Sequence, residues 1–266
     1  MLTDTDFTTI VEHIKKRYGI ELIQKRLLIE GRLSYTFKKH GFDDFHDYIM
    51  YVLNNTNTQR YIEFVDKLTT NHTYFMREKD HFDMITNEIL PHIENSVKDR
   101  DVRIWSAGCS FGNEPYNLAM VIDDYFGESA KNWDLKILAT DISSNALNHA
   151  KAGIYKPSDI EDLPEKWQNK YFNKTSDGNF QVSKQLRSQV VFKYFNLMDE
   201  FKHKKPFDLI LCRNVMIYFN SETRDNLVEK FYQNTKQGGY LLIGHAENVS
   251  VKSRFKMIKP SVLRHI

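Results

Sequence analysis

Glu114 is a carboxylate at the start of a predicted helix, directly after a glycine-containing turn. The turn spans residues 107–113, and Pro115 is typical of the first helical position. The two glycines have the spacing G-x-x-x-G, which is neither the dinucleotide pattern G-x-G-x-x-G nor a phosphate loop. A carboxylate at a helix start repels phosphate and attracts a cofactor with hydroxyls and a positive charge. The alternative is that Glu114 only complements the helix dipole, which contributes about 0.3 to 1 kcal/mol.

Asp141 is the second acidic residue at the end of a predicted strand, and it follows the apolar segment 135–140. At this position an acidic side chain typically accepts hydrogen bonds from the ribose hydroxyls of an adenosine cofactor. An aspartate there can equally be the N-cap of the next helix. Because two acidic residues end two consecutive strands, the pattern favours adenosine binding.

A third apolar strand, predicted at 207–212, leads directly into Arg213 and Asn214 and then into Tyr218 and Phe219. Methyltransferases that act on base amines often have Pro-Pro-Tyr after this strand, and that motif is absent here. For Tyr218 the alternative interpretation is a place in the hydrophobic core.

A sheet must position these residues, and the chain after residue 101 predicts one. Short apolar segments alternate with helical patterns, which is typical of a parallel sheet covered by helices; the segments are 102–107, 135–140, 207–212 and 240–244. Residues 157–195 interrupt this alternation of apolar segments and helices. They contain a predicted helix at 165–172, and the segments 179–182 and 190–192 alternate between apolar and polar residues like a hairpin. We therefore predict an α/β fold with a small antiparallel insertion at about 157–195.

The first 70 residues are predicted to be entirely helical. Phe7, Ile10, Val11 and Ile14 recur at the spacing of one apolar helix face, and further helices are predicted at 24–40, 42–54 and 58–68. The polar stretch that follows is interpreted as a connector, and a helix from 79 to about 96 is expected to be interrupted at Pro91. The predicted divisions are a helical domain at 1–70, a connector and linking helix at 71–96, and an α/β domain at 97–266.

Composition excludes several classes of function. The 266 residues are 41% hydrophobic and 27% charged, with a net charge of +2, which is too small to bind nucleic acid or an anionic membrane by its overall field. Cys109, Cys212 and the ten histidines never fall at the usual metal-ligand spacings, so no metal site is expected. No signal peptide or membrane span is predicted, so the expected location is the cytoplasm, and nothing suggests an obligate oligomer, so a monomer is expected.

The sequence resembles the CheR family of chemotaxis receptor glutamate O-methyltransferases, which depend on S-adenosylmethionine. The segments that carry the resemblance are TTNHTYFMRE (69–78), WSAGCS (105–110), EPY (114–116), ATDI (139–142), CRNVMIYF (212–219) and GHAEN (244–248). It implies a helical receptor-docking domain followed by a Rossmann-like class I methyltransferase domain with an inserted β-subdomain. The expected products are glutamyl methyl esters and S-adenosylhomocysteine, and the expected partners are the cytoplasmic methylation helices of methyl-accepting chemotaxis proteins.

The resemblance also implies which residues surround the cofactor: Asn71, Thr73, Arg77, Gly108, Glu114, Asp141, Asn196, Leu197, Arg213 and Asn214. Asp141 would bind the ribose hydroxyls, and Glu114 would reach the methionyl amino group or the polar edge of the cofactor. Arg77 would meet the cofactor's carboxylate or orient the incoming glutamate, and Tyr218 would lie near the transferred methyl. The alternative for Arg77 is a surface ion pair with Glu78 or Asp80.

Two features depart from the family pattern. Phe111 and Asn113 replace the commoner Thr and Glu, so one of two acidic residues is lost while Glu114 remains. The residues implied in receptor docking are basic and lie in the helix predicted at 24–40: Lys25, Arg32, Lys38 and Lys39. Three of them recur every seven residues on one side of that helix, although a solvated helix face is the alternative interpretation.

Rival functions remain open at this point. One is methylation of a small molecule, a nucleic acid or another protein, and another is a degenerate cofactor-binding module without activity. Whether residues 173–195 bind a peptide at the C-terminus of the receptor is also left open by the sequence.

Overall fold

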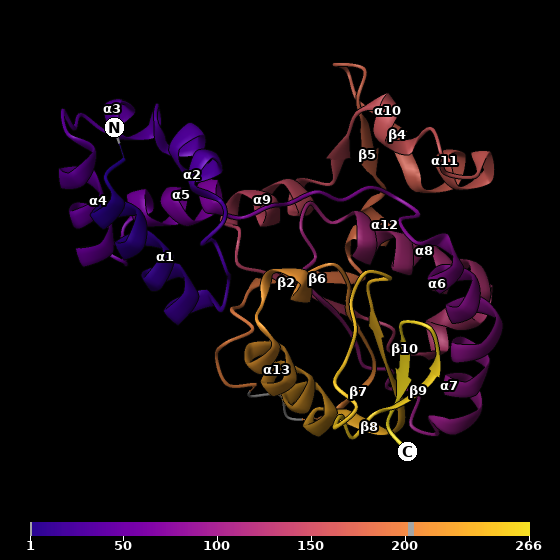
Figure 1. The fold of residues 1–266 in the computed structure, drawn as a ribbon. Helices are drawn as coiled ribbons and strands as arrows, with labels where there is room; N and C mark the ends of the chain where they lie inside the picture. Colours follow the sequence, from indigo (N-terminus) through magenta and orange to yellow (C-terminus); the bar gives the residue numbers. More distant parts are fainter. Residues whose placement is uncertain (1, 202–204) are drawn as a thin grey trace.

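A computed structural model describes residues 2–201 and 205–266 of the chain. Figure 1 shows a group of helices from the N-terminal part beside a larger body that is built around a sheet. Among the described residues, no helix is long and apolar enough to cross a membrane.

The N-terminal helices are α1 (Asp4–Tyr18), α2 (Arg26–Leu33), α3 (Thr36–Lys39), α4 (Phe45–Asn54) and α5 (Gln59–Leu68). The first helix begins at Thr3, whose hydroxyl accepts a hydrogen bond from the backbone N–H of Asp6, and it ends at Gly19 in the left-handed conformation. The apolar face predicted on this helix is confirmed, because Ile10 and Ile14 are buried in a core shared by these helices.

The prediction of one helix at 24–40 is wrong, because the chain divides into α2 and α3 at residues 34–35. The hydroxyl of Ser34 donates to the carbonyl of Gly31, and that of Thr36 donates to the carbonyl of Arg32. In a continuous helix these two carbonyls would accept from backbone N–H groups, so the side chains compete with the helix at this point.

The linking helix consists of α6 (Lys79–Met84), a π turn η1 (Ile85–Ile89) and α7 (Leu90–Ser96). The N–H of Leu90 bonds to the carbonyl of Ile85, five residues earlier. Pro91 has no N–H to donate, so the interruption expected there takes the form of a π turn in an otherwise continuous helix.

The main sheet has seven strands in the order β6-β2-β1-β7-β8-β10-β9. Five of them are parallel: β1 (Ile104–Ala107), β2 (Ile137–Asp141), β6 (Val190–Tyr194), β7 (Phe207–Cys212) and β8 (Thr235–Ile243). The other two strands, β10 (Val262–Arg264) beside β8 and β9 (Lys256–Lys259) at the edge, are antiparallel to their neighbours. Strand β1 has β2 on one side and β7 on the other, so the strand order reverses there, and ligands typically bind at such a point.

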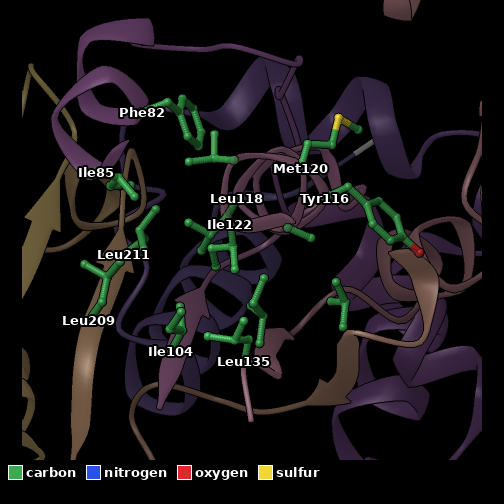
Figure 2. Close-up of a cluster of buried hydrophobic side chains, with 14 of the residues drawn as sticks. Phe82, Ile85, Ile104, Tyr116, Leu118, Met120, Ile122, Leu135, Leu209 and Leu211 are labelled. Atoms are coloured by element: carbon green, nitrogen blue, oxygen red, sulfur yellow. The ribbon is translucent and has the colours of Figure 1, made fainter. Parts of the chain in front are cut away.

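Helices cover both faces of the main sheet. They are α8 (Asn113–Phe126), η2 (Gly127–Asn132), α9 (Ser144–Ala152), η3 (Met216–Tyr218) and α13 (Ser221–Gln233). Side chains alternate along β1, so Ile104 joins a core with α8 and the linking helix, whereas Trp105 joins a core with α13. Figure 2 shows the first of these cores, in which Phe82 and Ile85 lie near Leu118 and Leu211.

A small antiparallel sheet lies beside the main one, with the order β3-β5-β4 (Figure 1). Its elements are β3 (Ile154–Tyr155), α10 (Pro157–Ile160), α11 (Glu165–Tyr171), β4 (Phe172–Lys174), β5 (Phe180–Val182) and α12 (Lys184–Arg187). The predicted pairing of 179–182 with 190–192 is wrong, because 190–192 belongs to β6 and pairs in parallel with β2. A short apolar segment does not specify its partner, and the true hairpin is formed by β4 and β5.

Candidate functional site

A cavity of about 340 Å³ opens where the carboxyl ends of β1, β2 and β7 meet the connector and the N-terminal helices. All ten residues expected around a cofactor line it, and so does Tyr218: Asn71, Thr73, Arg77, Gly108, Glu114, Asp141, Asn196, Leu197, Arg213, Asn214 and Tyr218. Of the residues expected in receptor docking, Lys25 and Arg32 also line the cavity. Its volume is within the usual range of about 300 to 1,000 Å³ for small-molecule sites.

Asp141 is the last residue of β2, and backbone groups orient its carboxylate. One oxygen accepts from the N–H of Ser110 and the other from the N–H of Ser143, both at 2.8 Å. Burial raises the pKa of Asp141, and these hydrogen bonds oppose the rise. The N-cap of α9 is Ser143, which accepts from the N–H of Ala146, so Asp141 does not have the alternative capping role. Each carboxylate oxygen keeps a second lone pair for a hydroxyl group in the cavity.

Glu114 lies in the first turn of α8, which begins after Gly112 in the left-handed conformation. Its carboxylate accepts from the hydroxyl of Ser106 at 2.7 Å and from Nη1 of Arg213 at 3.3 Å. Burial raises the pKa of Glu114, although the charge of Arg213 opposes this. Because the side chain is only 14% exposed and has two partners across the cavity, it does more than complement a helix dipole.

Arg213 follows β7 and connects the two sides of the site. Its guanidinium is 2% exposed and forms ion pairs with Glu114 at 3.3 Å and with Glu78 at 3.1 Å. It also donates to the backbone carbonyl of Arg77. The connector is therefore fastened to the edge of the sheet through one buried side chain.

Glu78 is a residue of this site that sequence reasoning missed, since it was considered only as a surface partner of Arg77. Its other oxygen accepts from Nδ2 of Asn214 at 3.2 Å and from the N–H of His245 at 3.1 Å. Burial raises the pKa of Glu78, but the His245 N–H and the charge of Arg213 outweigh burial, so the pKa lies below its usual value. Its position next to Arg77 in the connector motif was the available signal.

Glu247 was also missed as a positioning residue, although it lies in the segment 244–248 that supported the resemblance. It is 8% exposed and accepts from the N–H groups of Gly244 at 2.6 Å, Asn214 at 3.0 Å and Ile217 at 3.2 Å. These bonds hold the loop that carries Arg213 and Tyr218 against the segment after β8.

Strained backbone is concentrated around the cavity. Within the described ranges, six non-glycine residues have positive φ, and four of them belong to the connector or to cavity loops: Met76, Glu78, Ser110 and Asn214. Such conformations cost about 1 to 3 kcal/mol each and persist where surrounding contacts impose them, typically at functional sites.

Arg77 does not have the alternative role proposed for it, a surface ion pair. In the part of the chain that the structure describes, its guanidinium donates to the carbonyl of His72 at 2.7 Å and lies over the ring of Tyr74, and it has no acidic partner. It lines the cavity and keeps further N–H donors for an anionic group.

Several lining residues join the parts of the protein together. The hydroxyl of Ser110 donates to the carbonyl of Asn71 at 2.9 Å, and the Asn71 amide donates to Ser143 at 3.3 Å. The amide of Asn196 donates to the carbonyl of Arg17 in α1 at 2.7 Å and accepts from the N–H of Met198. The side chain of Asn196 is therefore bound within the protein.

Close backbone contacts shape the cavity floor at Gly108. Its φ is +90°, and a Cβ atom there would lie 2.4 Å from the Val215 side chain.

Burial raises the pKa values of Cys109 and Cys212 well above the usual thiol value, so neither thiol is poised for reaction.

The basic residues expected in receptor docking are divided between α2, α3 and the residue before α2, because the single helix predicted at 24–40 is interrupted at residues 34–35. Arg32 donates to the carbonyls of Lys67 and Thr69, at 3.2 and 2.8 Å, and so supports the start of the connector. Lys39 pairs with Glu63 at 3.0 Å. Lys25 and Lys38 are exposed.

Comparisons with known proteins agree with this arrangement. The family model described as "CheR methyltransferase, SAM binding domain" matches residues 71–263, and "CheR methyltransferase, all-alpha domain" matches residues 5–69. The chain is 44% identical over 268 residues to a "Chemotaxis protein methyltransferase" of Borreliella burgdorferi, covering 99% of this chain and 95% of that protein. It is 34% identical to a protein of the same name from Salmonella typhimurium, covering 94% and 85% respectively.

A third relative, "Chemotaxis protein methyltransferase 2" of Vibrio cholerae, is 32% identical over 94% of this chain and 88% of its own length. The all-alpha family model matches the chain before the SAM-binding model does, which is the order of the helical part and the sheet seen here. The chain belongs to the CheR family of S-adenosylmethionine-dependent methyltransferases that act in chemotaxis.

Proposed function

We propose that this protein transfers a methyl group from S-adenosylmethionine to glutamate side chains of chemoreceptors, forming glutamyl methyl esters. The observation that carries this proposal is the charge arrangement of the cavity. Asp141 ends β2 and Glu114 lies in the first turn of the helix after β1, while Arg77 forms no ion pair among the described residues. The two acidic residues suit a cationic nucleoside, and the free cation suits an anionic acceptor.

The residues present fit S-adenosylmethionine. The free lone pairs of Asp141 suit two ribose hydroxyls, and Glu114 suits the methionyl amino group. Gly108 lines the cavity and allows the close approach of Val215, and the lining at Asn71, Thr73, Asn196, Leu197, Arg213 and Asn214 completes the proposed cofactor site.

When bound, the cofactor supplies a methyl group on a sulfonium centre, and S-adenosylhomocysteine remains after transfer. A glutamate side chain has a pKa of about 4.3, so it is ionised at neutral pH and no general base is required. The protein's contribution is therefore positioning, which can supply roughly 7 to 11 kcal/mol when two reactants are held in near-attack geometry. Closure by the connector through Arg213 also excludes water.

Arg77 and Tyr218 are the residues that we place nearest to the reacting atoms. Arg77 orients the incoming carboxylate, since it lines the cavity and forms no ion pair among the described residues, although its charge also acts on Glu114. Tyr218 lies in η3, and its carbonyl accepts from the N–H of Glu21, which ties the loop after β7 to the N-terminal helices.

The proposed partners are the cytoplasmic methylation helices of methyl-accepting chemotaxis proteins, and the proposal includes a cytoplasmic location and a monomeric state. The proposed docking surface comprises Lys25, Arg32, Lys38 and Lys39, of which Lys25 and Arg32 reach the cavity. Leu27 is 84% exposed in the same helix as Arg32, so the surface offers an apolar contact as well as charge.

A labelling experiment tests the proposal. Incubation with methyl-labelled S-adenosylmethionine and membranes that contain chemoreceptors is expected to label the receptors, and mild base is expected to release the label because esters are base-labile. Label on receptors that resists base would show methylation of another group. Label that appears only on nucleic acid or small molecules would identify a different substrate.

Replacing two exposed lysines with alanine tests the docking surface. The double variant Lys25→Ala/Lys38→Ala is expected to slow receptor methylation several-fold at low salt, because both side chains are exposed and steer association with acidic helices. The deficit should shrink as salt rises towards 0.15 M, where charges are screened beyond about 8 Å.

The matched control is Lys136→Ala/Lys151→Ala, two exposed lysines of the α/β part. The control is expected to keep the normal rate, and both double variants are expected to keep normal cofactor affinity. Equal rates for the two double variants at low salt would reject a docking role for Lys25 and Lys38.

A further inference from the structure

Three potential metal ligands meet outside the cofactor cavity. Glu78 of the connector, His81 of α6 and His245 after β8 have ligand atoms that all lie within 4.8 Å of one another. The two imidazole rings are 4.8 Å apart at an angle of 73°. None of these three side chains lines the cavity that we assign to the cofactor.

His81 is a buried histidine whose two ring nitrogens both lack a hydrogen-bond partner among the described residues. The residue is 1% exposed, and neither Nδ1 nor Nε2 has a hydrogen-bond partner within the described residues. Its Nδ1 lies 3.4 Å from Oε2 of Glu78 but lacks the geometry of a hydrogen bond. A buried polar group without a hydrogen-bond partner lowers the stability of a protein by about 1 to 3 kcal/mol. The unpaired nitrogens of His81 therefore require an explanation.

His245 is oriented by an acidic residue, as metal-bound histidines usually are. Its Nε2 lies 3.0 Å from Oδ2 of Asp80, and the imidazole is 44% exposed. When Nε2–H donates to that carboxylate, Nδ1 keeps its lone pair for a metal ion. Asp80 therefore occupies the place of an outer carboxylate in a carboxylate–histidine–metal arrangement.

The spacing of one ligand pair suits a small tetrahedral ion, and the third ligand atom, which lies within 4.8 Å of both, would have to move closer to complete the site. Ligands that lie about 2.1 Å from Zn²⁺ at tetrahedral angles are about 3.4 Å apart, which is the separation of His81 Nδ1 and Glu78 Oε2. We propose that Glu78, His81 and His245 bind one Zn²⁺-class divalent ion, with water in the fourth position. Spacing along the sequence does not reveal this site, because His81 and His245 are far apart in the chain.

Glu78 links this metal site to the cofactor cavity, because the same carboxylate accepts from Arg213 and Asn214. A divalent ion competes with Arg213 for the carboxylate and loosens the fastening of the connector. Metal binding therefore weakens cofactor binding, and by linkage the cofactor weakens metal binding by the same factor. Metal binding itself does not depend on the proposed substrate.

Calorimetric titration of the full chain with Zn²⁺, and absorption spectra with Co²⁺ as a reporter of coordination, test the site. One equivalent is expected to bind with the spectrum of a four-coordinate ion. His245→Ala, which removes a half-exposed ligand and is expected to leave the fold intact, should weaken binding by at least about tenfold, and so should Asp80→Ala. His81→Gln provides a third variant at the buried position.

The control is His46→Ala, which removes another exposed histidine that pairs with an aspartate but has no third ligand in its neighbourhood within the described part. It should bind one equivalent with normal affinity. The affinity for S-adenosylhomocysteine should fall when Zn²⁺ is added and return with a chelator, and His245→Ala should abolish that response. Absence of one-equivalent binding, or equal affinity in His245→Ala and the unchanged protein, would overturn the proposal.

Discussion

Replacing Arg213 with alanine is expected to lower the free energy of unfolding by about 3 to 5 kcal/mol, the usual cost of removing one partner from a buried ion pair. Without Arg213, the carboxylates of Glu78 and Glu114 lose the cation that they share. The side chains are largely buried, with 12% of Glu78 and 14% of Glu114 exposed. It also removes the bond to the Arg77 carbonyl, so cofactor affinity should fall with stability. Chemical denaturation and calorimetry measure the two effects.

Arg254→Ala is a suitable control, because Arg254 forms an exposed pair with Glu229 at 3.1 Å. Exposed pairs contribute at most about 1 kcal/mol, so this variant should remain close to the unchanged protein. Arg213→Lys keeps the charge but loses the fork that reaches both carboxylates, so it should recover only part of the stability. A loss in Arg213→Ala no larger than that in Arg254→Ala would show that Arg213 does not fasten the connector.

Replacing Asp141 with alanine is expected to weaken binding of S-adenosylmethionine by about 1.5 to 3 kcal/mol, the usual contribution of hydrogen bonds to a charged group. The carboxylate is held by the N–H groups of Ser110 and Ser143, so it is already oriented before the ribose arrives. Asp141→Asn keeps the shape but loses one acceptor oxygen, and it should have an intermediate affinity.

The control for this prediction is Asp134→Ala, since Asp134 is an exposed aspartate that precedes the other end of β2. It should bind the cofactor with normal affinity in calorimetry. If Asp141→Ala binds as tightly as this control, the assignment of Asp141 to the ribose is wrong.

The acidic residues at the carboxyl ends of the strands could be predicted from the sequence, because each lies next in the chain to the strand or turn that positions it. An apolar strand that ends in Asp141, or a turn that ends in Glu114, can be recognised from consecutive residues, and parallel strands necessarily bring such ends together. The resemblance to the CheR family added the connector, which has no periodicity that would reveal its position.

Long-range contacts account for most of what was missed. Glu78 belongs to the site only because its left-handed backbone turns it toward Arg213 and His245, and nothing in neighbouring residues indicates that conformation. The break at 34–35 is a local exception, in which two hydroxyls bond to carbonyls of the preceding turn. The partner of 190–192 is likewise decided by the sheet that the segment joins, and not by its own alternation.

A crystal structure of the protein with S-adenosylhomocysteine is the most direct test of the account. The account predicts the nucleoside in the cavity, with both ribose hydroxyls within hydrogen-bonding distance of the Asp141 carboxylate and the amino group near Glu114. The sulfur should face the side of the cavity that carries Arg77 and Tyr218. Density for the nucleoside outside this cavity, or in it with the ribose directed away from Asp141, would contradict the account.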